Sequence, residues 1–319
     1  MSSRDLLHPE LHAWIDSLIP GTIDETTLGL ARKELAAMSA MVPTEHPGCE
    51  VVRTLATSED GYAVPLVVVR PTAPLPADGL RPAISWTHGG GYLAGHAIAE
   101  VPFLARLAAE HGMVGVSVDY RLAPEHPHPA PVEDGYAGLT WLHEHAGELG
   151  VDAARIAVGG ESAGGGLAAA VSTLARDRGG PAIARQLLVY PMLDDRTAAA
   201  EDSSHEIGVG EWLWSPASNR FAWRSLLGGV DPGSAEVSPY ASPARAGDLR
   251  GLPATFLDVG DLDLFAVECL GYAQRLVRAG VPTDLHLVAG AVHGYVYAGD
   301  DLAVVRAHRD RVRAFFADL

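Results

Sequence analysis

Short apolar segments alternate with helical segments along most of the chain, starting at about residue 83. Strands buried on both faces read as nearly continuous apolar runs, and strands joined by helices form right-handed parallel units. The pattern therefore predicts an α/β fold with a mainly parallel central sheet and helices on both faces. The predicted strands cover 83–87, 113–119, 155–159, 186–192, 254–259 and 285–288, and the predicted helices cover 103–110, 133–145, 163–178, 274–278 and 302–316.

The first 70 residues do not follow this alternation. Apolar side chains between residues 11 and 18 recur at helical spacing, so residues 1–50 are predicted to form one or two helices. Two β-rich runs follow within 49–70, and the turn signal SEDG at 58–61 separates them. This arrangement predicts a β-hairpin ahead of the alternating region.

The composition limits the partners of this chain. Its 319 residues and 48% apolar content suffice for a large core, and its formal net charge is −17. Nucleic-acid-binding proteins concentrate Lys and Arg, so this balance argues against a nucleic-acid partner and against an anionic membrane surface. No segment approaches the ~18 apolar residues of a membrane span, and residues 1–18 lack a basic start followed by an apolar signal core. We therefore expect a cytoplasmic protein.

The sequence predicts neither a metal nor a cofactor. The two cysteines, Cys49 and Cys269, lie far apart and in no metal-ligand spacing. We expect two reduced thiols, with a disulfide between them as the alternative. His143 and His145 are two apart on a predicted helix and would face apart, and no H-E-x-x-H motif is present.

Residues 160–164 read GESAG and match the motif G-x-S-x-G. A predicted strand leads into the motif and an alanine-rich predicted helix leaves it, which is the context of a nucleophile elbow. The serine of such a turn is strained, and the helix N-terminus offers partial positive charge to an oxyanion. We predict that Ser162 is a catalytic nucleophile. An ordinary buried serine in a strand–turn is the alternative.

A glycine-rich loop, HGGG at 88–91, follows the predicted strand 83–87. Successive glycines let backbone N–H groups approach a substrate carbonyl with no Cβ in the way. We expect the N–H groups of Gly90, Gly91 and Ala163 to form an oxyanion hole. A phosphate-binding loop is the alternative, but neither G-x-G-x-x-G nor a Walker lysine is present.

A serine nucleophile needs a general base, and the base needs an acid that fixes its tautomer. Of His205, His286 and His293, which all follow the serine, His286 falls inside a predicted strand. His293 lies just beyond that strand in a loop, which suits a mobile imidazole, and we predict that it is the base. The acid is expected at the carboxyl end of the predicted strand 254–259, where Asp261 and Asp263 both qualify.

About 60 residues between the strands 186–192 and 254–259 lack a clear strand. Loops of that length in compact domains are usually lids or binding elements. Three of the six tryptophans fall here, and we expect a helical cap over the site; an ordinary helix pair packed by its tryptophans is the alternative. The predicted division is N-terminal cap helices at 1–50, a core at 51–194 and 251–319, and a cap insertion at 195–250.

Three segments together, HGGG at 88–91, DYRLAPE at 119–125 and GESAGG at 160–165, resemble the bacterial hormone-sensitive-lipase family of esterases. The likeness covers the chain from about residue 50 to its end. It implies an α/β-hydrolase fold with a cap, cofactor-free hydrolysis of short-to-medium acyl esters, and frequent homodimers. It also implies that Gly90, Gly91 and Ala163 form the oxyanion hole.

The resemblance selects Asp263 as the acid. The family's acid sits in a D-P-L-x-D-E run, and Asp263 aligns with it, although Leu264 replaces the usual proline and Ala266-Val267 replaces the usual Arg-Asp pair. Around the site we expect contacts with substrate from five further residues: His88, Gly89, Tyr92, Trp212 and Trp214.

The function predicted from these residues is that of a carboxylesterase with a Ser-His-Asp triad. An amidase or deacetylase with the same triad is one alternative, because these motifs do not specify the leaving group. A non-catalytic small-molecule receptor on the same fold is another, and it would be favoured if the base were missing. A structural protein has no reason to keep nucleophile, base and oxyanion loop together.

Overall fold

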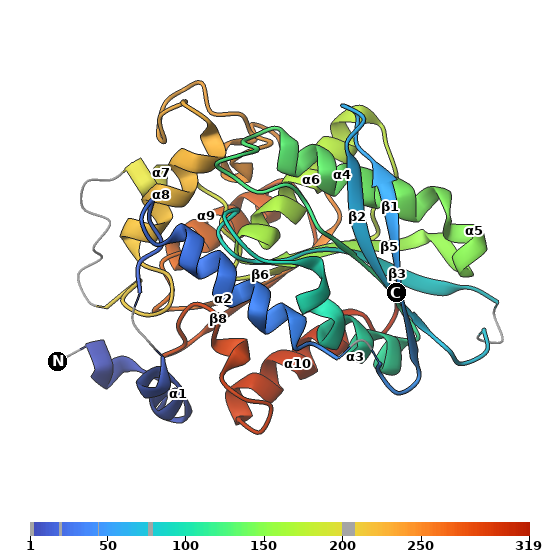
Figure 1. The fold of residues 1–319 in the computed structure, drawn as a ribbon, viewed down its shortest axis with the longest axis horizontal. Coiled ribbons are helices and arrows are strands. Elements are labelled where there is room, and N and C mark those ends of the chain that lie inside the picture. Colours follow the sequence, from blue (N-terminus) through green and yellow to red (C-terminus); the bar gives the residue numbers. More distant parts are fainter. Residues whose placement is uncertain (1–2, 19–20, 44, 76–78, 200–207) are drawn as a thin grey trace.

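A single mixed sheet forms the centre of the computed structural model, which describes residues 3–18, 21–43, 45–75, 79–199 and 208–319 (Figure 1). The strand order is β1-β2-β4-β3-β5-β6-β7-β8. β1 and β2 form the predicted hairpin, β2 pairs antiparallel with β4, and all other neighbours pair in parallel. The predicted mainly parallel sheet is therefore confirmed. The strands are β1 (Cys49–Thr57), β2 (Ala63–Pro71), β3 (Arg81–Thr87), β4 (Val114–Val118), β5 (Val151–Glu161), β6 (Arg185–Val189), β7 (Ala254–Gly260) and β8 (Thr283–Val288).

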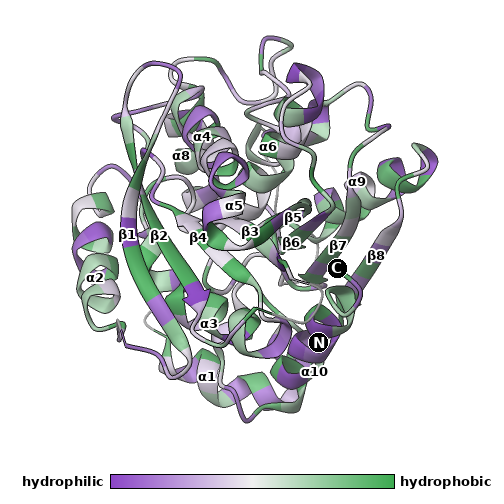
Figure 2. Cartoon of the chain, turned by 90° about the vertical axis from the view of Figure 1, so that its right-hand side faces the viewer, coloured by the Kyte–Doolittle hydropathy of each residue, from purple (hydrophilic) through white to green (hydrophobic). Residues whose placement is uncertain are grey.

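Helices cover both faces of the sheet. Figure 2 shows α3 (Val101–His111) and α10 (Ala303–Phe315) on one side, and α4 (Ala130–Glu144) and α6 (Ala163–Arg178) on the other. Both α3 and α6 end where a glycine adopts the left-handed conformation that closes helices. The remaining helices are α1 (His12–Ser17), α2 (Leu28–Ala40), α5 (Ala146–Leu149), α7 (Arg196–Ala199), α8 (Pro216–Leu227), α9 (Ala266–Arg278) and the 3-10 turns η1 (Ser3–Leu6), η2 (Pro9–Leu11), η3 (Ala97–Glu100), η4 (Pro243–Arg245) and η5 (Tyr295–Tyr297).

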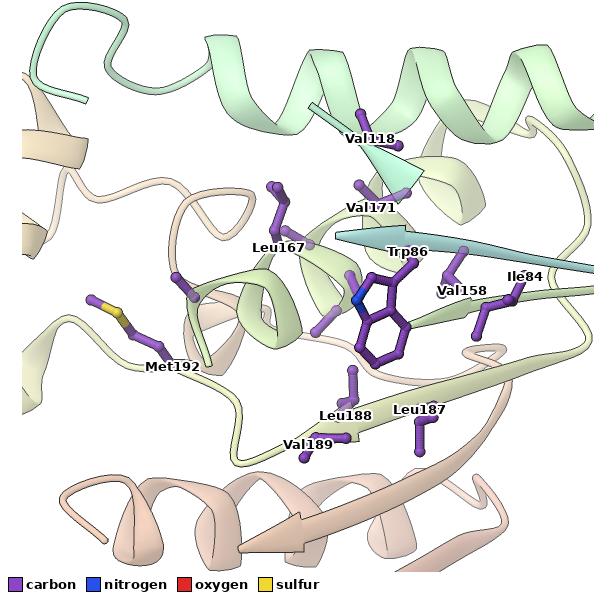
Figure 3. Close-up of a cluster of buried hydrophobic side chains, with 14 of the residues drawn as sticks. Ile84, Trp86, Val118, Val158, Leu167, Val171, Leu187, Leu188, Val189 and Met192 are labelled. Carbon is purple, nitrogen blue, oxygen red and sulfur yellow. The ribbon is translucent and has the colours of Figure 1, made fainter. Parts of the chain in front are cut away.

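The main core surrounds Trp86 on β3, all of whose residues are buried. Figure 3 shows its indole among apolar side chains of β5, β6 and α6. A Cβ at Gly159 would lie 2.8 Å from the indole, so the neighbouring strand needs a glycine there to admit the ring. Full burial of each large apolar side chain stabilises the fold by about 1.5–3 kcal/mol. This packing fixes the strands whose carboxyl ends carry the predicted site.

The N-terminal segment packs in a small cluster of its own. Leu7 and Ile15 are buried with Leu262 and Val292, and Trp212 is packed against them. The His8 N–H donates to the Gly290 carbonyl at 2.9 Å, which ties this segment to the loop after β8. The predicted N-terminal helices are thus present as η1, η2, α1 and α2, while the division into core and caps stays a prediction.

One predicted strand is too long. The sequence predicts a strand over 186–192, but β6 ends at Val189. Tyr190 has a φ of 35°, which no regular strand accommodates. Its N–H donates to the Asp258 carbonyl, and the Met192 N–H donates to the Ser162 carbonyl at 2.9 Å. The Tyr190 N–H thus makes the last bond of β6 to β7, and the Met192 N–H holds the serine turn instead of continuing the ladder.

Two further expectations concern membrane-spanning helices and the two cysteines. No helix in the described ranges is both long and apolar enough to cross a membrane. Cys49 and Cys269 are free thiols, as expected from the sequence, and Cys269 is buried.

Candidate active site

Ser162 sits at the tight turn between β5 and α6. Its φ of 54° and ψ of −124° are sterically unfavourable for a residue with a Cβ. The Ser162 N–H donates to the Val189 carbonyl at 2.9 Å, and the Ser162 carbonyl accepts from Gly166 and Met192. These bonds hold the strained conformation, as predicted for a nucleophile elbow.

Two glycines of the motif are required by close backbone contacts. A Cβ on Gly160 would lie 2.3 Å from the Gly164 carbonyl oxygen, and a Cβ on Gly164 would lie 2.1 Å from that of Thr87. Any side chain at either position would push the first turn of α6 away from β3. The spacing G-x-S-x-G thus follows from the packing of the serine turn against the neighbouring strand.

The structure brings Ser162, His293 and Asp263 into one hydrogen-bonded row. The Ser162 Oγ lies 2.8 Å from His293 Nε2, and His293 Nδ1 lies 2.8 Å from Asp263 Oδ2. All three side chains are buried, and Asp263 has no exposed surface. With the Nδ1 proton directed to the carboxylate, Nε2 is the nitrogen that can accept the serine proton.

The neighbouring carboxylates have other partners. Asp261 Oδ1 accepts from the Gly290 N–H at 2.7 Å and so holds the loop that leads to His293. Glu268, on α9, accepts from the Leu193 N–H and from Thr197, and burial raises its pKa well above the ordinary value. Of the two carboxylates left open by the residues alone, Asp263 is therefore the one that reaches the imidazole.

The other downstream histidines lie elsewhere. His286 stays within β8, and His205 lies outside the described residues. His308, which is not among the histidines weighed from the sequence, is buried on α10 with its Nδ1 3.4 Å from the Asp258 carboxylate. The Asp258 carboxylate also accepts a hydrogen bond from the hydroxyl of Tyr295, two residues after His293. Asp258 therefore links α10 to the loop that carries His293.

Three aromatic rings enclose His293. The ring centroids of Tyr190 and Phe265 lie 4.8 and 5.2 Å from that of the imidazole, both edge to face, and that of Trp214 lies 6.4 Å away. Such rings limit the rotation of the imidazole and reduce the water around it. The imidazole of His293 is therefore held in one orientation by packing as well as by Asp263.

The glycine loop after β3 exposes backbone donors beside this row. The Leu93 and Ala94 N–H groups both donate to the Gly90 carbonyl, at 3.0 and 3.1 Å, which folds the loop into a tight turn. Gly90 and Gly91 have φ values of 109° and 65°, which glycine adopts readily. In the described part of the chain, the N–H groups of Gly90, Gly91 and Ala163 have no acceptor.

The segment 119–125 supports the glycine loop. Asp119 accepts from the Ala97 N–H at 2.8 Å, the Tyr120 hydroxyl donates to the His88 carbonyl at 2.8 Å, and the Ala123 N–H donates to the Tyr92 carbonyl at 2.9 Å. From the sequence this segment enters only through the family resemblance. The sequence signal for this supporting role is an aspartate followed by a tyrosine, Asp119 and Tyr120, directly after a buried strand.

A partly buried acid next to Ser162 is also absent from the sequence prediction. The Glu161 carboxylate accepts from the hydroxyls of Tyr190, at 3.1 Å, and Tyr297. Burial raises its pKa above the ordinary value for glutamate. Because Tyr190 also contacts the His293 ring, Glu161 fixes one wall of the site.

The five predicted substrate contacts have different surroundings. His88 and Tyr92 are each 1% exposed: His88 stacks on Tyr120 at 4.2 Å, and Tyr92 packs toward Trp223. Gly89 faces Glu161, and Trp212 packs against the N-terminal cluster. Trp214 lies so close to Gly91 that a Cβ there would be 2.2 Å from the indole. Contact with substrate stays a prediction for all five.

No metal centre accompanies the row. Across the described ranges, no group of three or more His, Cys, Asp or Glu side chains is placed to hold a metal ion.

The chain is similar to known proteins in sequence and in fold. A protein-family model of the alpha/beta hydrolase fold matches residues 84–297. Esterase LipI of Mycobacterium tuberculosis is 37% identical over 259 residues, 80% of this chain and 78% of that protein. Ethyl acetate hydrolase of Pseudomonas putida is 28% identical over 303 residues, 92% of this chain and 93% of that protein. The solved structure of a bacterial heroin esterase has 37% identity and a TM-score of 0.89, and the match covers 98% of this chain and 97% of that one. The chain therefore belongs to the α/β-hydrolase family, among its serine ester hydrolases, as the sequence predicts.

Proposed function

We propose that this chain is a carboxylesterase that hydrolyses short-to-medium acyl esters through an acyl-enzyme on Ser162. The observation that carries the proposal is the continuous row from Ser162 through His293 to Asp263, with two contacts of 2.8 Å. The row lies beside backbone N–H groups that have no acceptor in the described chain.

The reaction then proceeds in two halves. His293 Nε2 takes the Ser162 proton while the Oγ forms a bond to the ester carbonyl carbon, and Asp263 stabilises the imidazolium. His293 next gives that proton to the leaving alcohol as the C–O bond breaks. Water repeats the sequence on the acyl-enzyme, which releases the carboxylic acid and restores the serine hydroxyl.

The oxyanion of each tetrahedral intermediate is assigned to the N–H groups of Gly90, Gly91 and Ala163. Ala163 is the first residue of α6, so the positive end of the helix also faces the developing charge. In a well-studied serine hydrolase, loss of one oxyanion-hole donor costs about 2.7–4 kcal/mol of barrier stabilisation. The Ser162 turn thus supplies both the nucleophile and one donor.

Trp214 is assigned to the wall of the acyl pocket. It is only 6% exposed, and it touches Gly91 while lying near His293, so an acyl chain bound at the row meets its indole. The name of the Pseudomonas putida relative, ethyl acetate hydrolase, also points to a small acyl group. Activity on p-nitrophenyl esters is expected to peak at roughly C2–C8 and to collapse for long-chain triglycerides, because the pocket is finite.

Replacing Trp214 with alanine is expected to shift the preferred acyl length upward, since each added methylene is worth about 1–3 kcal/mol in such a pocket. The kcat/KM ratio of C12 to C4 p-nitrophenyl esters measures the shift. Trp141→Ala is the matched control, because Trp141 lies on α4, where it stacks on His145 and packs against the main core. Strong hydrolysis of emulsified long-chain triglycerides by the unmodified protein would contradict the assignment of a closed acyl pocket.

Two finer expectations from the sequence stay predictions. These are a homodimer, which light scattering coupled to size-exclusion chromatography tests, and a cytoplasmic location, which fractionation of the source cells tests.

A further inference from the structure

Arg32 is a residue of α2 whose guanidinium group contacts the glycine loop of the site. Its Nε donates to the Leu93 carbonyl at 2.7 Å, and its Nη2 donates to the Ala123 carbonyl at 2.8 Å. Nη1 and Nη2 also donate to the two carboxylate oxygens of Glu125, at 2.6 and 2.7 Å. One cation thus joins the N-terminal helices to both the glycine loop and the segment 119–125.

The contact with Leu93 leads to the predicted oxyanion hole through two peptide groups. The C=O of Leu93 and the N–H of Ala94 belong to one planar trans peptide group and point in opposite directions. That Ala94 N–H donates to the Gly90 carbonyl at 3.1 Å. The Gly90 carbonyl in turn shares its peptide group with the Gly91 N–H. Arg32 therefore stands at one end of a hydrogen-bonded row whose other end is a predicted oxyanion donor.

A second row converges on the same peptide group. The Ala123 N–H donates to the Tyr92 carbonyl at 2.9 Å, and the N–H of the same peptide group, that of Leu93, donates to the Gly90 carbonyl at 3.0 Å. Arg32 fixes Ala123 from the other side through its carbonyl. Because a peptide group is rigid, two donors on the Gly90 carbonyl fix the direction of the Gly91 N–H.

The charge of Arg32 adds a second effect. Hydrogen bonds in series polarise one another. A cation that donates to the first carbonyl makes each following N–H a better donor. The guanidinium stays charged, and its hydrogen bonds lower the pKa of Glu125 to about 2, so the ion pair persists throughout the neutral range.

We propose that Arg32 is a positioning residue for ester hydrolysis, which orients and polarises the Gly91 N–H through the peptide groups of Leu93–Ala94 and Gly90–Gly91. This role rests on the proposed function, because it presumes that the Gly91 N–H binds the oxyanion. It gives the N-terminal helix α2 a part in the chemical step. A cap helix that only covers the substrate would alter binding instead.

The test compares Arg32→Ala and Arg32→Lys with Lys33→Ala, a matched control that removes the neighbouring, exposed charge of α2. Rates on p-nitrophenyl butyrate are divided by the active fraction, titrated with an organophosphate. For Arg32→Ala, kcat is expected to fall roughly 10- to 100-fold with KM within about twofold, because a weakened donor costs less than a lost one. The kcat of Arg32→Lys is expected to lie between those of Arg32→Ala and the unmodified enzyme, because an ammonium reaches fewer of these acceptors. The kcat of Lys33→Ala is expected to match that of the unmodified enzyme.

A trifluoromethyl ketone separates this role from a structural one, because its adduct on the serine carries an anionic oxygen in the oxyanion hole. Its inhibition constant should rise in Arg32→Ala by about the same factor as kcat/KM falls. If Arg32→Ala does not fold, Arg32→Lys and Glu125→Gln answer the same question, with the smaller effect expected for Glu125→Gln because both carbonyl contacts remain.

Two results would overturn the inference. The first is a kcat per titrated site of Arg32→Ala within twofold of the unmodified enzyme, or of Arg32→Lys if Arg32→Ala does not fold. The second is an unchanged inhibition constant for the ketone. Either result together with an inactive Ser162→Ala enzyme defeats only the role of Arg32. Full activity of Ser162→Ala would instead defeat the proposed function itself.

Discussion

Replacing Ser162 with alanine is expected to lower kcat by about 10⁵–10⁶, because removal of the nucleophile of a serine triad abolishes the acyl-enzyme route. The fold should persist, since among the described residues the Ser162 side chain hydrogen-bonds only to His293, and alanine keeps the Cβ. Steady-state kinetics on p-nitrophenyl butyrate measures the loss, and circular dichroism verifies the fold.

A second buried serine supplies the control. Ser172 lies on α6, and its Oγ donates to the Ala168 carbonyl of the same helix at 3.0 Å. Ser172→Ala should therefore keep nearly full activity. A stoichiometric organophosphate adduct should map to Ser162 by mass spectrometry, and an adduct on any other serine would refute the assignment.

Replacing Asp263 with asparagine is expected to lower kcat by at least ~10³. The carboxylate accepts a hydrogen bond from His293 Nδ1, with 2.8 Å between Nδ1 and Oδ2, whereas an amide can turn its NH₂ group toward the ring. The imidazole then carries its proton on Nε2 and cannot accept one from Ser162; in the best-studied triad this change costs about 10⁴. Rates at neutral pH, with folding verified by circular dichroism, measure the effect.

Asp261→Asn is the matched comparison, two residues away, and should cost less than ~10-fold in kcat. Asp261 accepts from the Gly290 N–H at 2.7 Å, and an asparagine oxygen can still accept that bond. An inactive Asp261→Asn enzyme with an active Asp263→Asn enzyme would show that the acid is misassigned, and it would leave Ser162 and His293 as they are.

The order of strands and helices could be predicted from the sequence. Each buried strand is a short apolar run, and the apolar residues of the helices recur at the 3.6-residue period. The strand predicted over 186–192 is too long because the same apolar pattern continues past its end. Pro191 and Met192 continue the apolar run, and apolarity alone does not reveal that Tyr190 adopts a positive φ. The backbone there is set by bonds to Asp258 and Ser162, which are distant in the sequence.

For the residues of the candidate triad, too, local sequence context indicates some positions, whereas others depend on contacts distant in the sequence. Ser162 and His293 could be singled out from the sequence because each lies in a loop after an apolar run, and their catalytic roles stay predictions. Asp261 and Asp263 share that local context, so the residues alone left both open, and the contact with His293 depends on how the chain turns after Gly260. Arg32 could not be foreseen, because its partners lie 61 to 93 residues away.

From the packing of the N-terminal segment we expect heat to inactivate the protein at a lower temperature than it unfolds the sheet. Leu262 and Val292, which directly precede Asp263 and His293, are buried with Leu7 and Ile15 in a cluster separate from the main core. So small a cluster opens at a far lower cost in free energy than the sheet does. Once it opens, the acid and the base lose their outer support while the strands remain paired. We therefore expect activity to disappear on warming before the circular dichroism signal of the secondary structure does, and to return on cooling because the sheet has stayed folded.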